Sequence, residues 1–135
     1  MSPGVLVDTN VLVDIATDDP RWAEWSSEAL RTAGQADRLV INPIIYAEVS
    51  TAFDRIEAVD ELLPASLFIR ENLPWEAAFL AGKAHLAYRR RGGEKRSTLP
   101  DFFIGAHAAV RGYALLSRDK GRFSTYFPSV PLMSP

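Results

Sequence analysis

Four acidic side chains stand at positions from which they could bind one cation together: Asp8, Glu48, Asp101 and Asp119. Asp8 directly follows the apolar run 5–7, and Asp119 comes two residues after the apolar stretch "YALLS". Unbroken apolar runs are typical of strands buried on both faces of a parallel sheet, and ligands of such sheets bind at the carboxyl ends of the strands. We therefore expect Asp8 and Asp119 at one edge of a sheet.

The other two acids lie on predicted helices. Glu48 falls between Ile45 and Ala52, at the edge of the apolar face of a helix that Pro43 opens. A carboxylate at that position is costly to bury without a partner. Asp101 stands in the first turn of a later helix. Two strand ends, a helix start and an inward-leaning glutamate can meet at one rim.

Each acid alone has a simpler structural explanation. Asp8 with Asn10 is typical of a strand exit followed by a helix cap, and Asp119 in "SRDKGRF" is typical of a turn. Asp101 in a first helical turn complements the helix dipole, and Glu48 needs only a salt bridge. The position of all four at the appropriate ends of their elements favours a shared site over four separate explanations.

The chemistry of a shared site follows from its donors. The chain has no cysteine and two histidines, His85 and His107, neither of which neighbours another type of metal ligand. We interpret both as packed or surface histidines. Oxygen donors alone select a hard cation, so the expected ion is Mg²⁺ or Mn²⁺. Such an ion would bind phosphate oxygens and activate water for attack on a phosphodiester.

Length and composition limit the class of protein. The 135 residues, 47% of them hydrophobic, favour a single domain over residues 1–135, with residues 132–135 as a frayed tail. The net charge of −2 argues against a general nucleic-acid coating protein. No apolar run is long enough for a membrane span, and the N-terminus does not resemble an export signal. The absence of cysteine fits a reducing compartment, so we expect a cytoplasmic protein.

Hydrophobic periodicity predicts strands that alternate with helices. Strands are expected at 5–7, 38–42, 113–117 and 130–133. A short helix capped by Asn10 is expected first. Further helices are expected at 20–33, 43–56, 58–69 with an interruption or a kink at Pro64, 74–91 and 99–112, and a loop is expected at 91–98. Strands separated by helices imply right-handed crossovers. The predicted fold class is therefore α/β, a three-layer α/β/α sandwich with a short, mostly parallel central sheet flanked by helices.

Four segments of the chain carry a resemblance to a known family. They are "VLVDTNVLVDI", "NPIIYAEVSTAF", "LPDFFIGAHAAVRGYALLSRDKGRFSTYF" and "PSVPLMSP". Together they resemble the PIN-domain ribonucleases, and more closely the VapC-type toxins of bacterial toxin–antitoxin pairs. The signal lies in the ordered set of an early D-x-N, a mid-chain helical glutamate, a P-D at a helix start and a late serine or threonine followed by R-D.

The resemblance implies a PIN-like fold and a metal-dependent endoribonuclease. It implies that the metal-binding catalytic acids are Asp8, Asp101, Asp119 and Glu48, the last directly or through a water molecule. The supporting positions are Thr9, Asn10 and Ser117. Serine stands at a hydroxyl position that is more often threonine in the family. Gly121 stands where some relatives carry a further acid, which leaves open whether the site holds one ion or two.

The resemblance also implies partners: an RNA substrate, a cognate VapB-type antitoxin that covers the acidic site, and a second copy of the chain. Candidate RNA-phosphate contacts are Arg89, Arg90, Arg91, Lys95, Arg96 and Arg118. A solvated helix end explains the basic run 88–96 equally well. Large apolar side chains on the predicted helices are candidates for a partner surface, although core packing also explains them: Trp22, Trp25, Phe68, Trp75 and Phe79.

Two other functions stay open on the residues alone. Phosphatases of the haloacid-dehalogenase type and receiver domains also have an aspartate after the first strand, and this aspartate becomes phosphorylated. Such phosphatases carry a second aspartate where this chain has Asn10. A catalytically silent RNA- or protein-binding module on the same fold is the second alternative. A phosphoenzyme formed on Asp8 would indicate the first, and an absence of cleavage would indicate the second.

Overall fold

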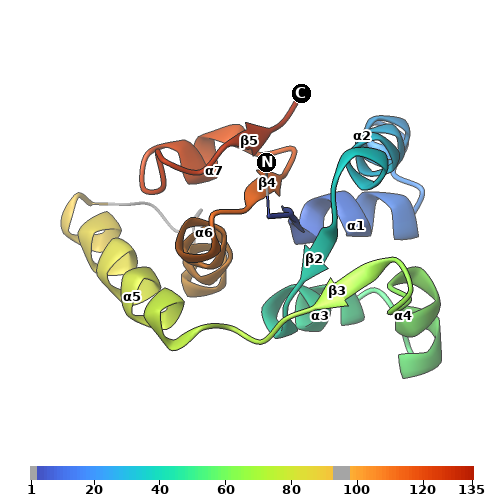
Figure 1. The fold of residues 1–135 in the computed structure, drawn as a ribbon, viewed down its shortest axis with the longest axis horizontal. Coiled ribbons are helices and arrows are strands. Elements are labelled where there is room, and N and C mark those ends of the chain that lie inside the picture. Colours follow the sequence, from blue (N-terminus) through green and yellow to red (C-terminus); the bar gives the residue numbers. More distant parts are fainter. Residues whose placement is uncertain (1–2, 93–97) are drawn as a thin grey trace.

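A five-stranded parallel sheet forms the centre of the computed structural model, which describes residues 3–92 and 98–135. Its strands are β1 (Val5–Val7), β2 (Leu39–Ile41), β3 (Phe68–Arg70), β4 (Ala114–Leu116) and β5 (Leu132–Met133). They lie in the order β3-β2-β1-β4-β5, and every neighbouring pair is parallel. All carboxyl ends therefore lie at one edge of the sheet, with β1 in the middle (Figure 1).

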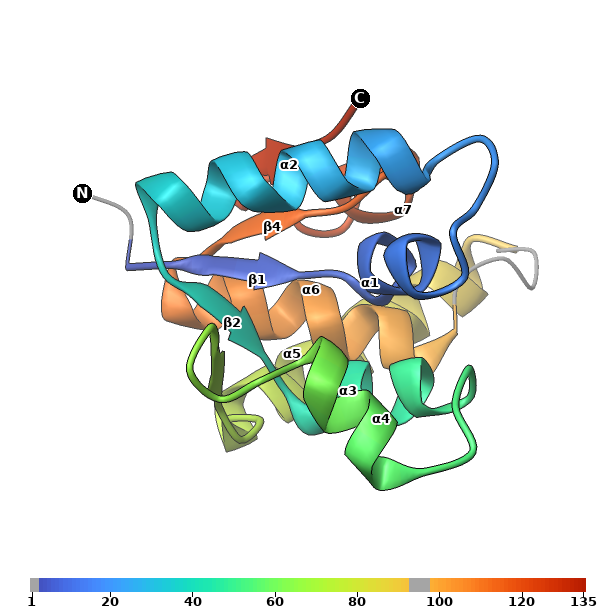
Figure 2. The same ribbon diagram turned by 90° about the vertical axis from the view of Figure 1, so that its right-hand side faces the viewer.

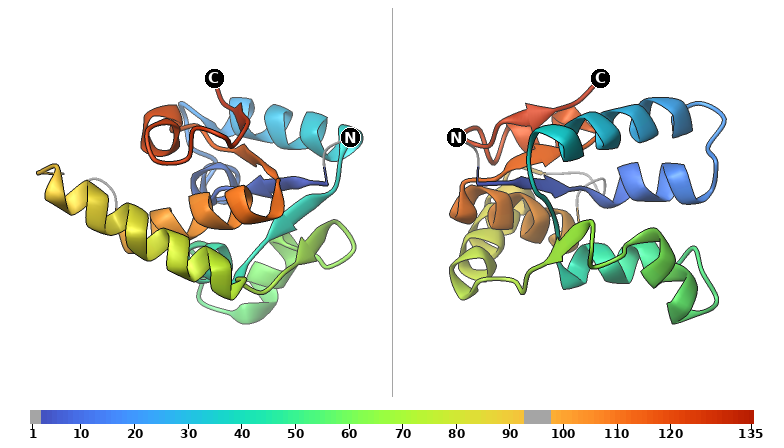
Figure 3. Two further views of the ribbon diagram at one scale, coloured as in Figure 1. Left: turned by 60° about the vertical axis from the view of Figure 1, so that its left-hand side comes forward. Right: turned by 45° about the vertical axis from the view of Figure 1, so that its right-hand side comes forward.

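Helices cover both faces of the sheet. They are α1 (Thr9–Ala16), α2 (Ala23–Ala36), α3 (Pro43–Ser50), α4 (Ile56–Leu62), α5 (Trp75–Arg90), α6 (Leu99–Arg111) and α7 (Lys120–Ser124). Figures 2 and 3 show α2 on one side of β1 and β4 and α6 on the other, with α5 packed outside α6. The predicted three-layer α/β/α sandwich is confirmed. No helix in the described part of the chain is long and apolar enough to span a membrane.

The short apolar strands are buried because helices cover them on both sides. Every residue of β1 and β2 is buried, which is the pattern expected of central parallel strands. On the α6 side, Phe102 packs against the rings of His85 and Tyr88 from α5 at centroid distances of 5.4 and 5.5 Å. These contacts pack α6 against α5 behind the middle of the sheet, where its first turn faces the carboxyl edge.

Two predicted helix starts are wrong, and aspartates explain both. Asn10 does not cap the first helix; Asp8 does, because its carboxylate accepts a hydrogen bond from the Thr9 backbone N–H at 2.8 Å. The helix expected at 20–33 begins at Ala23, because the Asp19 carboxylate accepts from two backbone N–H groups, at residues 21 and 22, and holds a turn there.

The helix predicted over 43–56 ends at Ser50. The hydroxyls of Ser50 and Thr51 donate back to the carbonyl oxygens of Tyr46 and Glu48, each at 2.7 Å. Such back-bonding competes with continuation of the helix. Its end exposes Ile56, which periodicity had placed on the buried face and which opens α4 instead.

The helix predicted over 58–69 is interrupted before Pro64, as one of the two expected outcomes, but its second half is wrong. Helix α4 ends at Leu62, and the Pro64 carbonyl accepts from the N–H groups of Leu67 and Phe68 in a turn. Phe68–Arg70 then pairs with β2 as strand β3. The free edge of β2 decides this outcome, because a strand of three residues is stabilised by its neighbour and not by its own pattern.

The final strand predicted over 130–133 is confirmed in its second half. Leu132 and Met133 form β5, because their backbone pairs with Leu115 and Leu116 of β4, and this pairing excludes both residues from the frayed tail predicted over 132–135. The turn expected at "SRDKGRF" contains the short helix α7, capped by the Asp119 carboxylate. Most of the predicted loop 91–98 lies outside the described residues.

Candidate active site

Asp8 is the buried centre of the carboxyl edge. It follows β1, is 2% exposed, and accepts hydrogen bonds from the Thr9 N–H at 2.8 Å and from the Ser117 hydroxyl at 2.7 Å. Burial raises the pKa of Asp8 from 3.8 to about 6, and the Ser117 hydrogen bond and the nearby Arg122 charge oppose the rise. An acid so placed gains most from a cation that compensates its negative charge.

Ser117 ties the ends of β1 and β4 together. Besides donating to Asp8, its hydroxyl oxygen accepts from the Asn10 side-chain amide at 3.3 Å and from the Asp119 N–H at 3.0 Å. The side-chain carbonyl oxygen of Asn10 in turn accepts a hydrogen bond from the Arg118 backbone N–H at 3.4 Å. Two of the three predicted supporting residues, Asn10 and Ser117, therefore lie beside Asp8 and orient the chain that follows each strand.

Glu48 reaches the same region from α3. It is half-buried, and its Oε1 accepts from the Thr9 hydroxyl at 2.7 Å. A hydroxyl, and not the salt bridge considered from the sequence, is the partner of this carboxylate. Thr9 thus contacts Asp8 with its backbone and Glu48 with its side chain, so it spaces these two acids.

Asp101 approaches from the first turn of α6. It is 8% exposed and forms a capping box with Thr98, whose N–H donates to Asp101 Oδ2 at 2.9 Å. The simpler structural explanation of Asp101 therefore holds for one of its oxygens. Its other oxygen, Oδ1, faces the Arg122 guanidinium at 3.3 Å, so Asp101 also belongs to the acidic group.

Asp119 joins the group through Arg122. The two terminal nitrogens of Arg122 each contact one carboxylate, Nη1 that of Asp101 at 3.3 Å and Nη2 that of Asp119 at 3.1 Å. Arg122 was not among the residues predicted from the sequence. The available signal was its spacing of three residues from Asp119, at which an acid and a base on one helical turn pair.

A cavity of about 390 Å³ brings these side chains together. Its walls are Asp8, Thr9, Asn10, Val13, Glu48, Thr51, Asp101, Arg118 and Arg122. Three of the four predicted acids line it directly, and they come from the end of β1 and from the two helices α3 and α6. The chain segments that supply them are 40 and 53 residues apart in sequence, at 8, 48 and 101.

The chain matches the sequence pattern of the PIN domain over residues 5–126. It belongs to the PIN-domain family. This match spans all four candidate acids and the whole sheet except β5. No curated protein sequence matches the chain.

Solved structures share the fold of this PIN domain at low sequence identity. A VapBC2 complex from Rickettsia felis bound to promoter DNA has a TM-score of 0.73 at 16% identity and covers 96% of this chain and 97% of its own. FitAcB from Neisseria gonorrhoeae has a TM-score of 0.70 at 19% identity, with 97% of each chain covered. A toxin–antitoxin complex from Klebsiella pneumoniae has a TM-score of 0.70 at 21% identity, with 98% of each chain covered.

The donor atoms of the PIN-domain site are of the type that a hard cation binds, but they lie too far apart to hold one in this structure. Asp8, Glu48 and Asp101 offer only oxygen atoms, and Asp8 is buried with its charge incompletely compensated. In the described part of the chain, however, no three acidic or histidine side chains are close enough to hold a metal ion as they stand. The Arg122 guanidinium already supplies the positive charge between Asp101 and Asp119.

The predicted basic residues divide into two groups. Arg118 lines the acidic cavity, but its Nε donates to the buried Asp14 at 2.8 Å and its guanidinium lies over the Trp22 ring at 5.4 Å. Arg89, Arg90 and Arg91 are exposed at the end of α5. Lys95 and Arg96 lie outside the described residues. The structure therefore explains Arg118 as part of an ion pair and leaves the three α5 arginines available to a ligand.

Both histidines are packed, as expected from the sequence. His107 is fully buried, with one ring nitrogen 2.9 Å from the Asn42 amide and the other 2.7 Å from Glu71 Oε1. Burial lowers the pKa of His107, and Glu71 opposes this. His85 packs edge-on against Phe102. Neither ring lines the acidic cavity.

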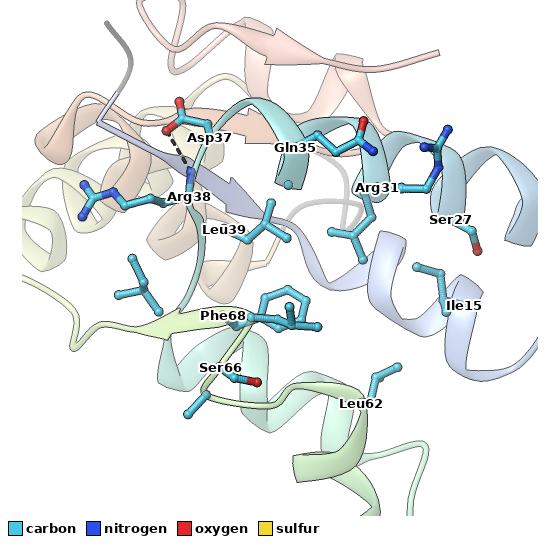
Figure 4. A pocket seen from close by; sticks show the side chains of 15 residues that line it. Ile15, Ser27, Arg31, Gln35, Asp37, Arg38, Leu39, Leu62, Ser66 and Phe68 are labelled. Carbon is cyan, nitrogen blue, oxygen red and sulfur yellow. Dashed lines mark hydrogen bonds between the residues drawn. The ribbon is translucent and has the colours of Figure 1, made fainter.

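A larger hollow lies away from the acids. It measures about 730 Å³ and runs between α2 and the β3 edge, with Ile15, Leu39, Leu62 and Phe68 among its apolar walls (Figure 4). Its charged walls are Arg31, Asp37 and Arg38. None of the four candidate acids lines it, so this hollow is separate from the acidic cavity.

Proposed function

We propose that this PIN domain is a metal-dependent endoribonuclease of the VapC toxin type that hydrolyses RNA phosphodiester bonds. One observation carries the proposal: Asp8, Glu48 and Asp101, from three separate elements, line one cavity at the carboxyl edge of a parallel sheet. Buried carboxylates gathered without an equal number of cations destabilise a fold, so a site that keeps them is expected to bind a cation.

The four acids divide the work of such a site. Asp8, Asp101 and Asp119 would hold Mg²⁺ or Mn²⁺ as direct ligands, and Glu48 would hold it directly or through a water molecule. An ion held there would supply an acidified water and positive charge opposite the phosphate. Ser117 and Asn10 hold Asp8 in place, and Thr9 holds Glu48. Because these partners are hydrogen-bonded before any ligand arrives, the oxygens need little rearrangement.

The substrate we propose is RNA, in the cytoplasm. Arg89, Arg90 and Arg91 are exposed at the C-terminal end of α5, the helix that precedes α6 and Asp101 in the sequence. Cations at such a position neutralise phosphates and hold a strand near the acids. Arg118 contributes positive charge to the cavity wall while its Nε stays paired with Asp14.

We propose a VapB-type antitoxin as the protein partner. The similar solved structures include a toxin–antitoxin complex and a VapBC complex bound to promoter DNA. These chains resemble the present one over nearly their full length, so the same type of partner can fit it. The test co-expresses the antitoxin with this chain. We expect the two proteins to purify together and the complex to cleave no RNA.

We also propose a homodimer. Trp75 and Phe79 lie one helical turn apart on α5 and are 88% and 69% exposed. The other candidates for a partner surface are less exposed: Phe68 is buried, and Trp22 and Trp25 are half-buried. Large exposed apolar side chains on one helix face are typical of an interface. Light scattering on the purified chain, compared with Trp75→Ser and Phe79→Ser variants, measures the mass directly.

The experiment that tests the proposed reaction determines the ends of the RNA products. Hydrolysis by water leaves a 5′-phosphate and a 3′-hydroxyl, whereas attack by the RNA 2′-hydroxyl leaves a cyclic phosphate. We expect the first pair of ends, in a reaction that EDTA stops and Mn²⁺ restores. Cyclic phosphate ends would contradict the mechanism. A phosphorylated Asp8 would point to a phosphatase, and a chain that leaves RNA intact with metal present would point to a binding module.

A further inference from the structure

Arg122 lies between two of the proposed metal-binding carboxylates. Its Nη1 contacts Asp101 at 3.3 Å and its Nη2 contacts Asp119 at 3.1 Å. These two acids come from different elements, α6 and the residue that caps α7. One guanidinium thus joins two carboxylates that the chain holds separately.

We propose that Arg122 is an internal counter-cation, which holds the acidic site together in the metal-free protein and is displaced from Asp101 and Asp119 when a divalent ion binds. The proposal rests on the proposed metal site and adds a residue that must move before the site is filled. Arg122 would then set the metal concentration at which the enzyme becomes active.

The case begins with charge. A guanidinium and a divalent cation cannot share the same oxygens, because like charges at a few ångströms repel and each oxygen has a limited number of lone pairs. Since Arg122 uses Asp101 Oδ1 and Asp119 Oδ2, an ion that takes these atoms must break both contacts. Arg122 also lines the same cavity as Asp8, so its charge lies next to the third acid as well.

The local structure allows the side chain to leave without unfolding its helix. The Arg122 side chain is 28% exposed, whereas the next residue, Phe123, is 1% exposed and anchors α7 in the core. Asp119 caps α7 through Oδ1, which accepts the Arg122 backbone N–H at 3.3 Å, and pairs with the guanidinium through Oδ2. Departure of the guanidinium therefore leaves the backbone cap in place.

The test compares Mg²⁺ affinity of the EDTA-treated full chain with that of Arg122→Gln by titration calorimetry. Glutamine removes the charge that competes with the metal, so we expect Mg²⁺ to bind about tenfold more tightly, as the loss of one charge-assisted contact implies. Melting of the metal-free variant should occur at a lower temperature, because three acids then repel without compensation. Arg122→Lys keeps a charge that cannot bridge both carboxylates and should fall between the two.

Lys120→Gln is the matched control. Lys120 is an exposed residue of the same helix, and its replacement removes the same charge without removing a contact to the acids. We expect its Mg²⁺ affinity to stay within about twofold of wild type, since an exposed charge is largely screened. An equal gain in Lys120→Gln and Arg122→Gln would overturn the proposal, because it would reflect net charge alone.

A second readout follows the guanidinium itself. The Arg122 side-chain N–H resonances, assigned by their absence in Arg122→Gln, should shift during a Mg²⁺ titration at the metal concentration that calorimetry gives. Binding of Mg²⁺ with no change in these resonances would overturn displacement while leaving the metal site intact. Failure of Mg²⁺ to bind either protein at millimolar concentration would overturn the metal-dependent function as well.

Discussion

The Ser117 hydroxyl donates a 2.7 Å hydrogen bond to Asp8 Oδ2 across a separation of 109 residues. It connects the ends of β4 and β1, which are neighbours in the sheet. Both side chains are buried, and the same serine oxygen accepts from Asn10 and from the Asp119 N–H. A single hydroxyl therefore sets the relative positions of two of the four proposed metal-binding acids.

Replacement of Ser117 by alanine should lower the free energy of unfolding by about 1–3 kcal/mol. The variant leaves the buried Oδ2 of Asp8 without a donor and two N–H groups without an acceptor, while Oδ1 keeps the Thr9 N–H. Urea denaturation measures the loss. Ser117→Thr retains the hydroxyl and should recover most of it. Equal stability of Ser117→Ala and wild type would show that the hydroxyl does not hold Asp8.

Asp8→Asn should stabilise the metal-free protein at neutral pH but not in acid. Because burial raises the pKa of Asp8 from 3.8 to about 6, the folded state holds this proton more tightly than the unfolded chain does. Folding therefore loses stability as pH rises through that window, by about 3 kcal/mol at 1.36 kcal/mol per pKa unit. Asparagine carries no such proton. The variant should gain up to that amount above about pH 6 and nothing below about pH 4.

Urea denaturation in EDTA across this pH range is the measurement. Asp54→Asn, on the exposed surface, serves as the control and should show no comparable pH-dependent difference from wild type. A gain for Asp8→Asn that stays constant with pH would mean that a change in packing, and not the removed charge, is responsible.

Asp101→Asn should reduce Mn²⁺-dependent RNA cleavage by at least about 100-fold, because the amide cannot supply a charged ligand. Its remaining oxygen can still accept from Thr98, and the lost contact to Arg122 is partly exposed, so stability should fall by no more than about 1 kcal/mol. Asp54→Asn is again the control. Asp14, which lies six residues after Asp8, is unsuitable as a control substitution, because it is buried and paired with Ser26 and Arg118.

Cleavage assays and melting curves on the same preparations separate the two effects. If Asp101→Asn cleaves RNA at the wild-type rate, Asp101 is only the capping residue of α6. If the variant unfolds, its role in the fold outweighs any role in catalysis, and the proposed assignment of this acid loses its support.

Gly105→Ala should destabilise the protein by about 1–3 kcal/mol. A Cβ at this position of α6 would lie 2.4 Å from two ring carbons of Phe127, which is itself buried. Gly82→Ala, on α5, meets nothing within 4 Å and should gain about 0.5–1 kcal/mol from helix propensity. Thermal melting of the two variants compares them directly. Equal melting temperatures of the two variants would show that Phe127 moves away from the added methyl group without cost.

Neutralising Arg89, Arg90 and Arg91 together should weaken RNA binding and flatten its salt dependence if they contact phosphates. The log–log slope for a single strand should decrease by up to about 2. Fluorescence anisotropy of labelled RNA in the Asp101→Asn background measures the slope without cleavage. A triple variant of exposed arginines elsewhere is the control: Arg21, Arg31 and Arg55. The same slope in both triple variants would return the α5 arginines to a purely structural role.

The sequence by itself determined the layered fold and most of the acidic group. The apolar runs before Asp8 and Ser117 are long enough for strands and too continuous for a half-exposed sheet, so parallel strands covered by helices follow from local pattern. A carboxylate at a strand end or in a first helical turn is a local feature as well. These patterns place Asp8, Glu48 and Asp101 near one edge without any knowledge of long-range contacts.

Only the tertiary structure decided which partners these acids have. Phe68–Arg70 becomes a strand because β2 offers an open edge, and α3 stops early because two hydroxyls compete for its carbonyls. The pairing of Asp101 with Arg122 likewise depends on how distant parts of the chain pack together. Sequence periodicity reports which face of an element is buried, but a contact between side chains 21 residues apart depends on the packing of α6 against the chain that follows β4.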